Sequence, residues 1–97
     1  MKQSYVYILK CSDDTYYTGI TSNLTNRISE HKNGKHIESY TYTRRPIKLV
    51  FYAGFTDINL AIQTEKQIKK WSRAKKEALI NNEFDKLSNL AKKSFNK

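Results

Sequence analysis

The feature that most constrains the fold is the stretch YVYILKCSDDTYYTG, which covers residues 5–19. It contains two short runs rich in tyrosine and other β-forming residues, and a short polar segment separates them. Runs of this kind joined by a polar turn are typical of a β-hairpin. We therefore predict antiparallel strands over residues 4–10 and 15–21.

The turn length decides which hairpin side chains share a face. If the turn has an odd number of residues, such as 12–14, then Tyr7, Tyr17 and Gly19 lie on one face, because side chains alternate along a strand. Gly19 has no side chain, and we expect it to leave room beside Tyr7 for a backbone or a substrate. A buried tyrosine hydroxyl also needs a hydrogen-bond partner.

The middle of the chain predicts one helix and one more strand. Residues 21–34 have helical spacing, with Ser22 or Asn23 suited to cap the start and Gly34 suited to the left-handed position after the end. Residues 35–46 form a polar, basic connection that contains the only proline. Residues 47–55 are rich in β-formers and mostly apolar, so we expect them to form a central strand.

The last third predicts two helices, over residues 58–71 and 72–80. Thr56 or Asp57 can cap the first of them, and Ser72 can cap the second. The order β-β-α-β-α-α predicts a small α+β domain in which helices flank a three-stranded antiparallel-type sheet. We expect this domain to span residues 1–82, and residues 83–97 to form a basic C-terminal tail or short helix.

Charge points to an anionic partner. The 97 residues carry 18 Lys and Arg against 9 Asp and Glu, a net charge of +9. Residues 23–48 carry +4 (six basic minus two acidic), and residues 66–97 carry +7 (ten basic minus three acidic). Two basic blocks on one domain suggest a polyanion, most often a nucleic acid. The alternative is a solvated lysine surface with no such partner, and composition leaves both open.

Cysteine content and hydropathy predict the compartment. Cys11 is the only cysteine, which excludes an internal disulfide and a cysteine-based zinc site, and we expect it to be a half-buried strand residue. No segment is long and apolar enough to span a bilayer, and the first apolar run is too short for a secretory signal. We therefore expect a cytoplasmic protein with no membrane contact, and we favour a monomer.

Two polar residues lie beside the core-facing stripe of the first predicted helix. Leu24 and Ile28 define that stripe, and Arg27 and His31 flank it four residues apart. An arginine beside the core is costly to desolvate unless it meets an anion. In the alternative interpretation, Arg27 extends over the sheet to reach solvent and His31 caps a backbone carbonyl.

A carboxylate interrupts the apolar stripe of the next helix. Glu65 falls on the row of residues formed by Ile58, Ala61, Ile62 and Ile68. A carboxylate in that position needs a cation, an arginine or a proton. It is either the partner of Arg27 or of a lysine, or a ligand for a hard metal ion.

These residues resemble a known pattern. Tyr5-Val6-Tyr7 and Tyr17-Thr18-Gly19, with ten residues from Tyr7 to Tyr17, resemble the paired strand motifs of the GIY-YIG nuclease superfamily. The similarity continues through NLTNRISEH and Glu65 and covers residues 4–80. The chain is most similar to the short stand-alone bacterial branch, whose YTGIT…L…R…EH…RRP…LV run is present here.

The resemblance implies a role for each matching residue. It implies that Tyr7 helps to deprotonate the attacking water and that Tyr17 lies near the scissile phosphate. Arg27 would contact that phosphate, and His31 falls where relatives have His or Tyr. Glu65 would be the single protein ligand of a divalent metal, with Mg²⁺ as the first candidate and Mn²⁺ as the second.

The chain also departs from the family pattern. Tyr5 replaces the first glycine of the motif, and Ile20 stands where many relatives have a lysine directly after the second motif. The asparagine that relatives place after the metal-binding glutamate has no clear counterpart. Tyr5 and Gly19 are expected to shape the site rather than to react.

The resemblance implies a metal-dependent endonuclease that hydrolyses DNA phosphodiester bonds, in repair or on branched DNA. The alternatives are a nucleic-acid-binding protein of the same fold that has lost efficient cleavage, and an interaction module for acidic partners. DNA is the expected partner, and RNA stays open. We expect basic residues beside the cleft that the candidate catalytic residues border, and on the later helices, to contact phosphates: Lys35, Arg44, Arg45, Lys48, Lys69, Lys70 and Arg73.

Overall fold

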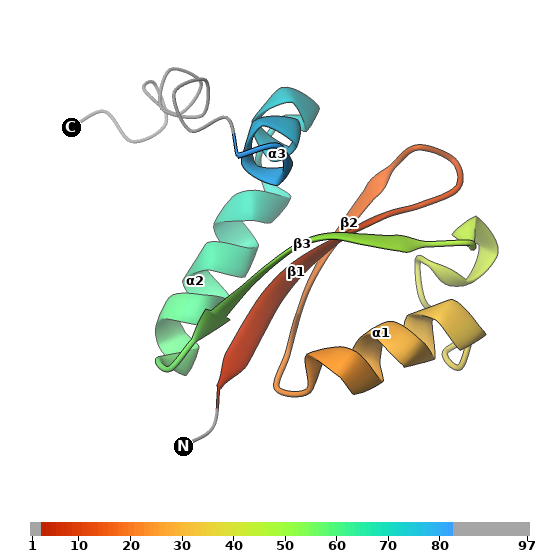
Figure 1. The fold of residues 1–97 in the computed structure, drawn as a ribbon, viewed down its shortest axis with the longest axis horizontal. Coiled ribbons are helices and arrows are strands. Elements are labelled where there is room, and N and C mark those ends of the chain that lie inside the picture. The colour runs from red at the N-terminus through yellow and green to blue at the C-terminus, as the bar shows by residue number, and fades with distance from the viewer. Residues whose placement is uncertain (1–2, 83–97) are drawn as a thin grey trace.

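The computed structural model describes residues 3–82 and contains one antiparallel sheet covered by helices on both faces (Figure 1). The strands are β1 (Ser4–Lys10), β2 (Tyr16–Thr21) and β3 (Lys48–Phe55). The helices are α1 (Leu24–Asn33), α2 (Ile58–Lys69) and α3 (Arg73–Ile80), with a short 3₁₀ helix, η1 (Tyr42–Arg44), before β3. The predicted fold class and element order are confirmed. The predicted tail at 83–97 lies outside the described residues.

The central strand is β1, so the prediction that residues 47–55 form the centre is wrong. The strand order is β2-β1-β3, with both pairs antiparallel. Residues Val6 to Leu9 are fully buried, because helices cover both faces of β1. The edge strand β3 exposes Lys48, Tyr52 and Gly54 and is only partly buried elsewhere. Its apolar composition reflects partial burial on both faces rather than a central position.

The two faces of the sheet carry separate apolar cores. On the α1 face, Tyr7, Leu9 and Ile28 pack with Ile47 and with Cys11, which is buried directly after β1 rather than half-buried within it. On the opposite face, the remaining β1 side chains pack against α2, α3 and Trp71, through a cluster centred on Val6, Ile8, Ala61 and Ile68. The ribbon shows the same division, with α1 on one side of the strands and α2 and α3 on the other (Figure 1).

The predicted helix ends are confirmed where their caps can be seen. Asn23 caps α1 by accepting a hydrogen bond from the Asn26 amide, and Gly34 ends it with a φ of 67°. Asp57 caps α2 and Ser72 caps α3 in the same way. These side chains satisfy backbone N–H groups that the first helical turn leaves unpaired.

The buried row of α2 differs from the predicted one. Ala61, Glu65 and Ile68 are buried, whereas Ile58 and Ile62 are exposed. The helix is turned so that the row at 61, 65 and 68 faces the sheet, which places Glu65 directly on the buried side. Within residues 3–82, no helix is long and apolar enough to cross a membrane.

Candidate active site

The hairpin places Tyr7 over Gly19. In the β1–β2 register Tyr7 lies opposite Gly19 and Leu9 lies opposite Tyr17, so the predicted shared face is confirmed. A Cβ built on Gly19 would lie 2.5 Å from Cζ of Tyr7. The space that glycine leaves is therefore filled by the Tyr7 ring itself, not by a substrate or a backbone as expected.

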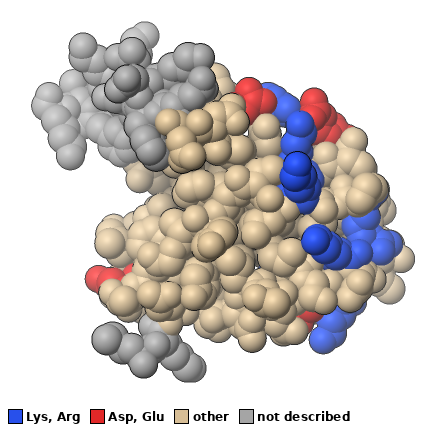
Figure 2. Space-filling model, viewed as in Figure 1, with Lys and Arg blue, Asp and Glu red and all other residues tan. Residues whose placement is uncertain are grey.

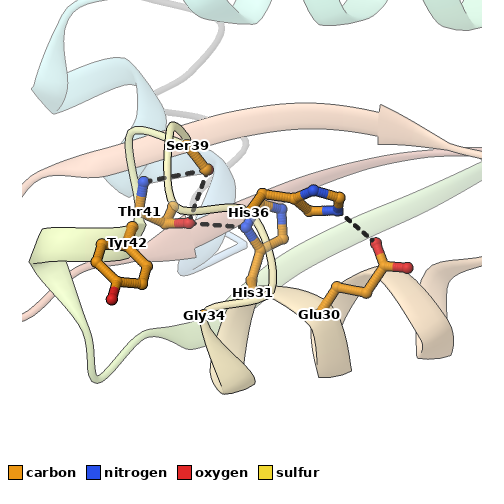
Figure 3. A pocket seen from close by; sticks show the side chains of 7 residues that line it. All are labelled: Glu30, His31, Gly34, His36, Ser39, Thr41 and Tyr42. Carbon is orange, nitrogen blue, oxygen red and sulfur yellow. Dashed lines mark hydrogen bonds and ion pairs between the residues drawn. The ribbon is translucent and has the colours of Figure 1, made fainter.

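The Tyr7 hydroxyl contacts a buried histidine. The Oη atom of Tyr7 lies 3.0 Å from Nε2 of His31, and both side chains are buried. On the other side of the imidazole ring, Nδ1 of His31 lies 2.8 Å from Oγ1 of Thr41. This oxygen is itself 3.1 Å from Oγ of Ser39. Figure 3 shows His31 reaching from α1 toward Thr41 and Ser39 in the loop above it. His31 thus contacts two side-chain hydroxyls, not the backbone carbonyl of the alternative interpretation.

Tyr17 completes an aromatic cluster around this contact. Its ring centroid lies 6.3 Å from that of Tyr7 and 5.4 Å from that of His31. Tyr40 stacks on Tyr17 at 5.9 Å with an interplanar angle of 22°, and the Arg44 guanidinium lies 3.8 Å from the Tyr40 ring centre. These rings pack around Tyr7, which is fully buried.

Burial controls the protonation of Tyr7 and His31. Burial, reinforced by Tyr17, raises the pKa of Tyr7 to about 12, and Arg27 acts against this rise. Burial also lowers the pKa of His31, and Arg27 and His36 lower it further while Glu30 opposes them. Tyr7 is therefore a neutral phenol at pH 7, and His31 is favoured as a neutral imidazole, which can accept a proton.

Arg27 lies at the rim of this cluster. Its Nε atom lies 3.3 Å from Oε1 of Glu30, and the side chain remains partly exposed. Glu30 also pairs with Lys35 at 3.5 Å. It pairs with His36 at 3.1 Å as well (Figure 3). The guanidinium is close enough to Tyr7 to affect its pKa, and its exposed part is available to an anion.

Glu65 is set apart from the other four family-matching residues. It lies on α2, which packs on the sheet face opposite Tyr7. The residue is only 8% exposed, and its Oε2 atom lies 2.7 Å from Nζ of Lys69, one turn further along α2. Its partner is thus a lysine and not Arg27. The hydrogen bond from Lys69 to Glu65 is the main cause of a raised pKa of Lys69, and Tyr17 raises this pKa further. The Glu65–Lys69 pair is therefore close enough to Tyr17 to interact with it electrostatically.

The acidic residues limit how a metal could be held. Within residues 3–82, no group of three or more His, Cys, Asp or Glu side chains could hold an ion. Glu65 can supply one hard oxygen ligand from a buried position beside β2. A single carboxylate, completed by waters and phosphate oxygens, fits the chemistry of Mg²⁺, which keeps much of its hydration. The ammonium group of Lys69 pairs with this carboxylate, so it would have to move away before a metal ion could bind there.

Several of the seven predicted phosphate-binding residues already have partners in the protein. Arg44 pairs with Asp13 at 3.0 Å, and Arg73 pairs with Asp14 and Glu77. The guanidinium of Arg45 packs over Gly34 and the Tyr42 ring. Lys35 and Lys69 pair with the glutamates described above, whereas Lys48 and Lys70 form no ion pair within the described part of the chain.

Basic side chains gather along one margin of the molecule. Figure 2 shows Lys and Arg concentrated toward the hairpin and η1 side, with acidic side chains next to the upper group (Figure 2). The hairpin turn supplies two of these acidic partners, Asp13 and Asp14. The basic surface is therefore partly neutralised where it meets the turn.

Sequence reasoning missed Thr41 as a partner in the site. Thr41 belongs to a segment without regular periodicity, so no local pattern connects it with a histidine ten residues earlier. The Glu65–Lys69 pair could have been read directly, because Glu and Lys four residues apart share one helix face.

Comparison with known proteins agrees with this geometry. The family model described as "GIY-YIG catalytic domain" matches residues 3–78. A UPF0213 protein of Syntrophus aciditrophicus is 49% identical over 80 residues, covering 82% of this chain and 92% of that protein. One of Clostridium perfringens is 44% identical over 89 residues, covering 92% and 95%.

Two solved structures are also similar. The solution NMR structure of a UPF0213 protein from Bacillus halodurans has a TM-score of 0.55 at 40% identity, covering 81% of this chain and 83% of that one. The solution NMR structure of a protein from E. faecalis has a TM-score of 0.60 at 31% identity, covering 84% and 86%. The chain therefore belongs to the GIY-YIG nuclease family, alongside short UPF0213 proteins.

Proposed function

We propose that this protein is a divalent-metal-dependent endonuclease that hydrolyses phosphodiester bonds in DNA, with branched or flapped DNA among its substrates. The contact between the Tyr7 hydroxyl and Nε2 of His31 carries the proposal. A hydroxyl and an imidazole at hydrogen-bond distance form a proton-transfer pair, and the family places this tyrosine beside the attacking water.

Tyr7 alone would be a poor base, because its neutral phenol has no site basic enough to take a proton from water at pH 7. His31 removes this difficulty. As the Tyr7 oxygen takes a proton from water, its own proton passes to Nε2 of His31. This transfer requires a neutral His31, and burial favours that state by lowering its pKa.

Thr41 is compatible with this direction of transfer. For Nε2 to accept, Nδ1 must carry the ring proton and donate a hydrogen bond, and Oγ1 of Thr41, which can accept one, lies 2.8 Å away. The tautomer of a histidine is set by the partner of its other ring nitrogen. Arg27 would bind the phosphate at the exposed edge of the cluster, through its partly exposed guanidinium.

Glu65 would hold the cation as its one protein ligand. When bound, a divalent cation would supply positive charge that stabilises the developing charge on the phosphate. The ion pair with Lys69 orients the buried carboxylate without a metal. Because Lys69 is 52% exposed, its ammonium group can turn into solvent at little cost.

The test is a cleavage assay on flapped, branched and fully paired DNA with Mg²⁺, Mn²⁺ or a chelator. Glu65→Gln is expected to abolish metal-dependent cleavage, because an amide lacks the charge that holds a hard cation. Its free energy of unfolding should fall by less than about 1 kcal/mol, since the ion pair it breaks is open to solvent on the lysine side.

Lys69→Gln is the matched control, because it breaks the same ion pair from the other side. It is expected to keep metal-dependent cleavage and to need less metal for half of the maximal rate. If Glu65→Gln cut DNA as fast as wild type, Glu65 would not be part of the catalytic site. Equal loss of cleavage and of stability in both variants would make the pair structural.

A further inference from the structure

An open cavity lies on the α1 face of the sheet, beside the Tyr7 cluster but separate from it. It has a volume of about 330 Å³ and lies between the start of α1 and the strands β1 and β3. Its lining consists of Tyr5, Ser22, Asn23, Leu24, Thr25 and Tyr52. The volume falls in the range of small-ligand pockets. None of the roles assigned above uses this cavity.

Tyr52 forms the exposed wall of the cavity. Its side chain is 58% exposed, and it lies opposite Tyr7 in the β1–β3 register, so both rings belong to the same sheet face. Tyr5 meets it edge-on, with centroids 6.5 Å apart and an interplanar angle of 60°. A large exposed ring that a second ring buttresses from the side is a suitable platform for a planar ligand.

Tyr40, the other exposed tyrosine of this face, is not such a platform. It stacks on Tyr17 and also meets the guanidinium of Arg44 over its ring. In the described residues Tyr52 has no parallel ring contact and no cation over its ring. The free aromatic surface of the α1 face is therefore at Tyr52.

The rest of the lining matches a nucleobase. It provides one aliphatic side chain, Leu24, and the short polar side chains of Ser22, Asn23 and Thr25. A base has two apolar faces and a polar edge, and this lining can contact both kinds of surface. No acidic residue lines the cavity, so nothing there repels the phosphates on either side of a base.

We propose that this cavity binds one unpaired nucleobase of the DNA strand whose phosphate lies at Tyr7 and Arg27, by stacking on Tyr52. The identification of that strand rests on the proposed nuclease function. Tyr52 lies opposite Tyr7 on the adjacent strand, with Cα atoms roughly 5 Å apart. This spacing is between one and two steps of a stacked strand at roughly 3.4 Å each.

The proposal restricts the substrate. A base inside a continuous duplex is covered on both faces by its neighbours, so its faces are not available to a protein ring. A base in a flap, a frayed end or a single strand has a free face. The protein should therefore hold DNA that is unpaired about one to two nucleotides from the scissile phosphate more tightly than continuous duplex.

The experiment measures binding of DNA in a chelator, where no cleavage occurs. The probes are a flapped DNA with 2-aminopurine at the unpaired position and a fully paired duplex of the same sequence. Wild type is expected to quench the 2-aminopurine fluorescence of the flapped DNA. Tyr52→Ala should raise the Kd for flapped DNA by roughly 5- to 100-fold and leave the Kd for duplex unchanged. Tyr52→Phe keeps the ring and should bind like wild type.

A flap with an abasic nucleotide at the probe position is the matched ligand control. It should weaken binding by wild type to the level of Tyr52→Ala and should not change binding by Tyr52→Ala. This measurement on wild type holds even if a variant folds poorly. The proposal would be overturned if wild type bound the abasic flap as tightly as the intact flap. It would also be overturned if Tyr52→Ala lost affinity equally for flap and duplex. A wild type that fails to cut DNA with metal but shows the stacking signature would refute only the proposed nuclease activity.

Discussion

At the scale of residues, Tyr7 is fixed from three directions. Gly19 leaves the space into which its ring fits, Tyr17 lies beside the ring, and His31 contacts its hydroxyl. These contacts leave the ring no second position in the packed layer. The glycine of the second family motif is thus needed for the placement of the tyrosine of the first motif, a relation between two strands and not a property of either one.

Gly19→Ala tests this relation. Its methyl group would lie 2.5 Å from Cζ of Tyr7, and the neighbouring rings allow little movement. We expect unfolding to become easier by about 1–3 kcal/mol, as in other overpacked cores, and cleavage to fall more than tenfold because the Tyr7 hydroxyl leaves His31. Urea denaturation and the cleavage assay measure the two effects.

Gly54→Ala is the matched control on the edge strand. A Cβ at Gly54 would lie 3.3 Å from both Cε1 of Tyr5 and the flexible end of Gln3, a contact that a small shift relieves. This variant should fold and cut like wild type. If Gly19→Ala also did so, Tyr7 would not depend on the space that Gly19 leaves.

At the scale of elements, the end of α1 is tied to the segment that follows it. The Lys35 amide donates to the Glu30 carbonyl at 3.0 Å, and His36 and Lys35 pair with the Glu30 carboxylate. His31 points inward from the same turn and contacts Thr41. The irregular segment therefore closes over α1 through one buried histidine, whose two ring nitrogens both contact side-chain hydroxyls.

This arrangement predicts a pH dependence of stability. Burial lowers the pKa of His31, so in acid the unfolded chain binds a proton that the folded protein resists. The free energy of unfolding should therefore decrease as pH falls below the ordinary histidine value of about 6.5, and this group should have no effect well above it. Thermal unfolding between pH 7.5 and 5 measures the change.

His31→Gln should flatten this dependence, while His36→Gln, which removes the exposed histidine, should keep it. The carboxyl groups of Asp13 and Glu30 do not contribute to the change in stability between pH 7.5 and 5. The Thr15 hydroxyl lowers the pKa of Asp13, and His36 lowers that of Glu30. Groups of this kind lose their stabilising effect only as pH falls through about 4 and below. An equal pH dependence in wild type and His31→Gln would contradict the prediction.

At the scale of the whole molecule, the 18 Lys and Arg residues overstate the free basic surface. Asp13 and Asp14 in the hairpin turn form ion pairs with part of this basic surface, and Glu30 pairs with three more basic side chains. We expect exposed lysines outside these pairs, such as Lys48 and Lys70, to be the more effective phosphate contacts.

DNA binding should weaken steeply with salt, because each phosphate contact releases counterions. Lys48→Gln and Lys70→Gln should each reduce the slope of log affinity against log salt by about one unit if the residue contacts a phosphate. Arg44→Gln should change the slope less, because Asp13 already pairs with Arg44. Titrations at several salt concentrations measure the slopes, and an affinity that does not depend on salt would rule out a phosphate-binding surface.

The sequence by itself determined the features that depend on near neighbours. Alternation along two strands predicted the shared face of Tyr7, Tyr17 and Gly19 for a turn with an odd number of residues, and the register confirms it. Capping side chains fixed the helix starts, and the ordered motifs identified the family. Each of these signals is contained within a few residues or within a spacing along one element.

Only the tertiary structure decided which elements meet. The central position of β1 depends on helices from distant segments covering both of its faces, and no pattern within β1 or β3 reveals this. The filling of the Gly19 space by Tyr7 and the contact of His31 with Thr41 likewise join side chains far apart in sequence. Periodicity shows that a side chain is buried, but its partner is set by packing between elements, which local sequence does not encode.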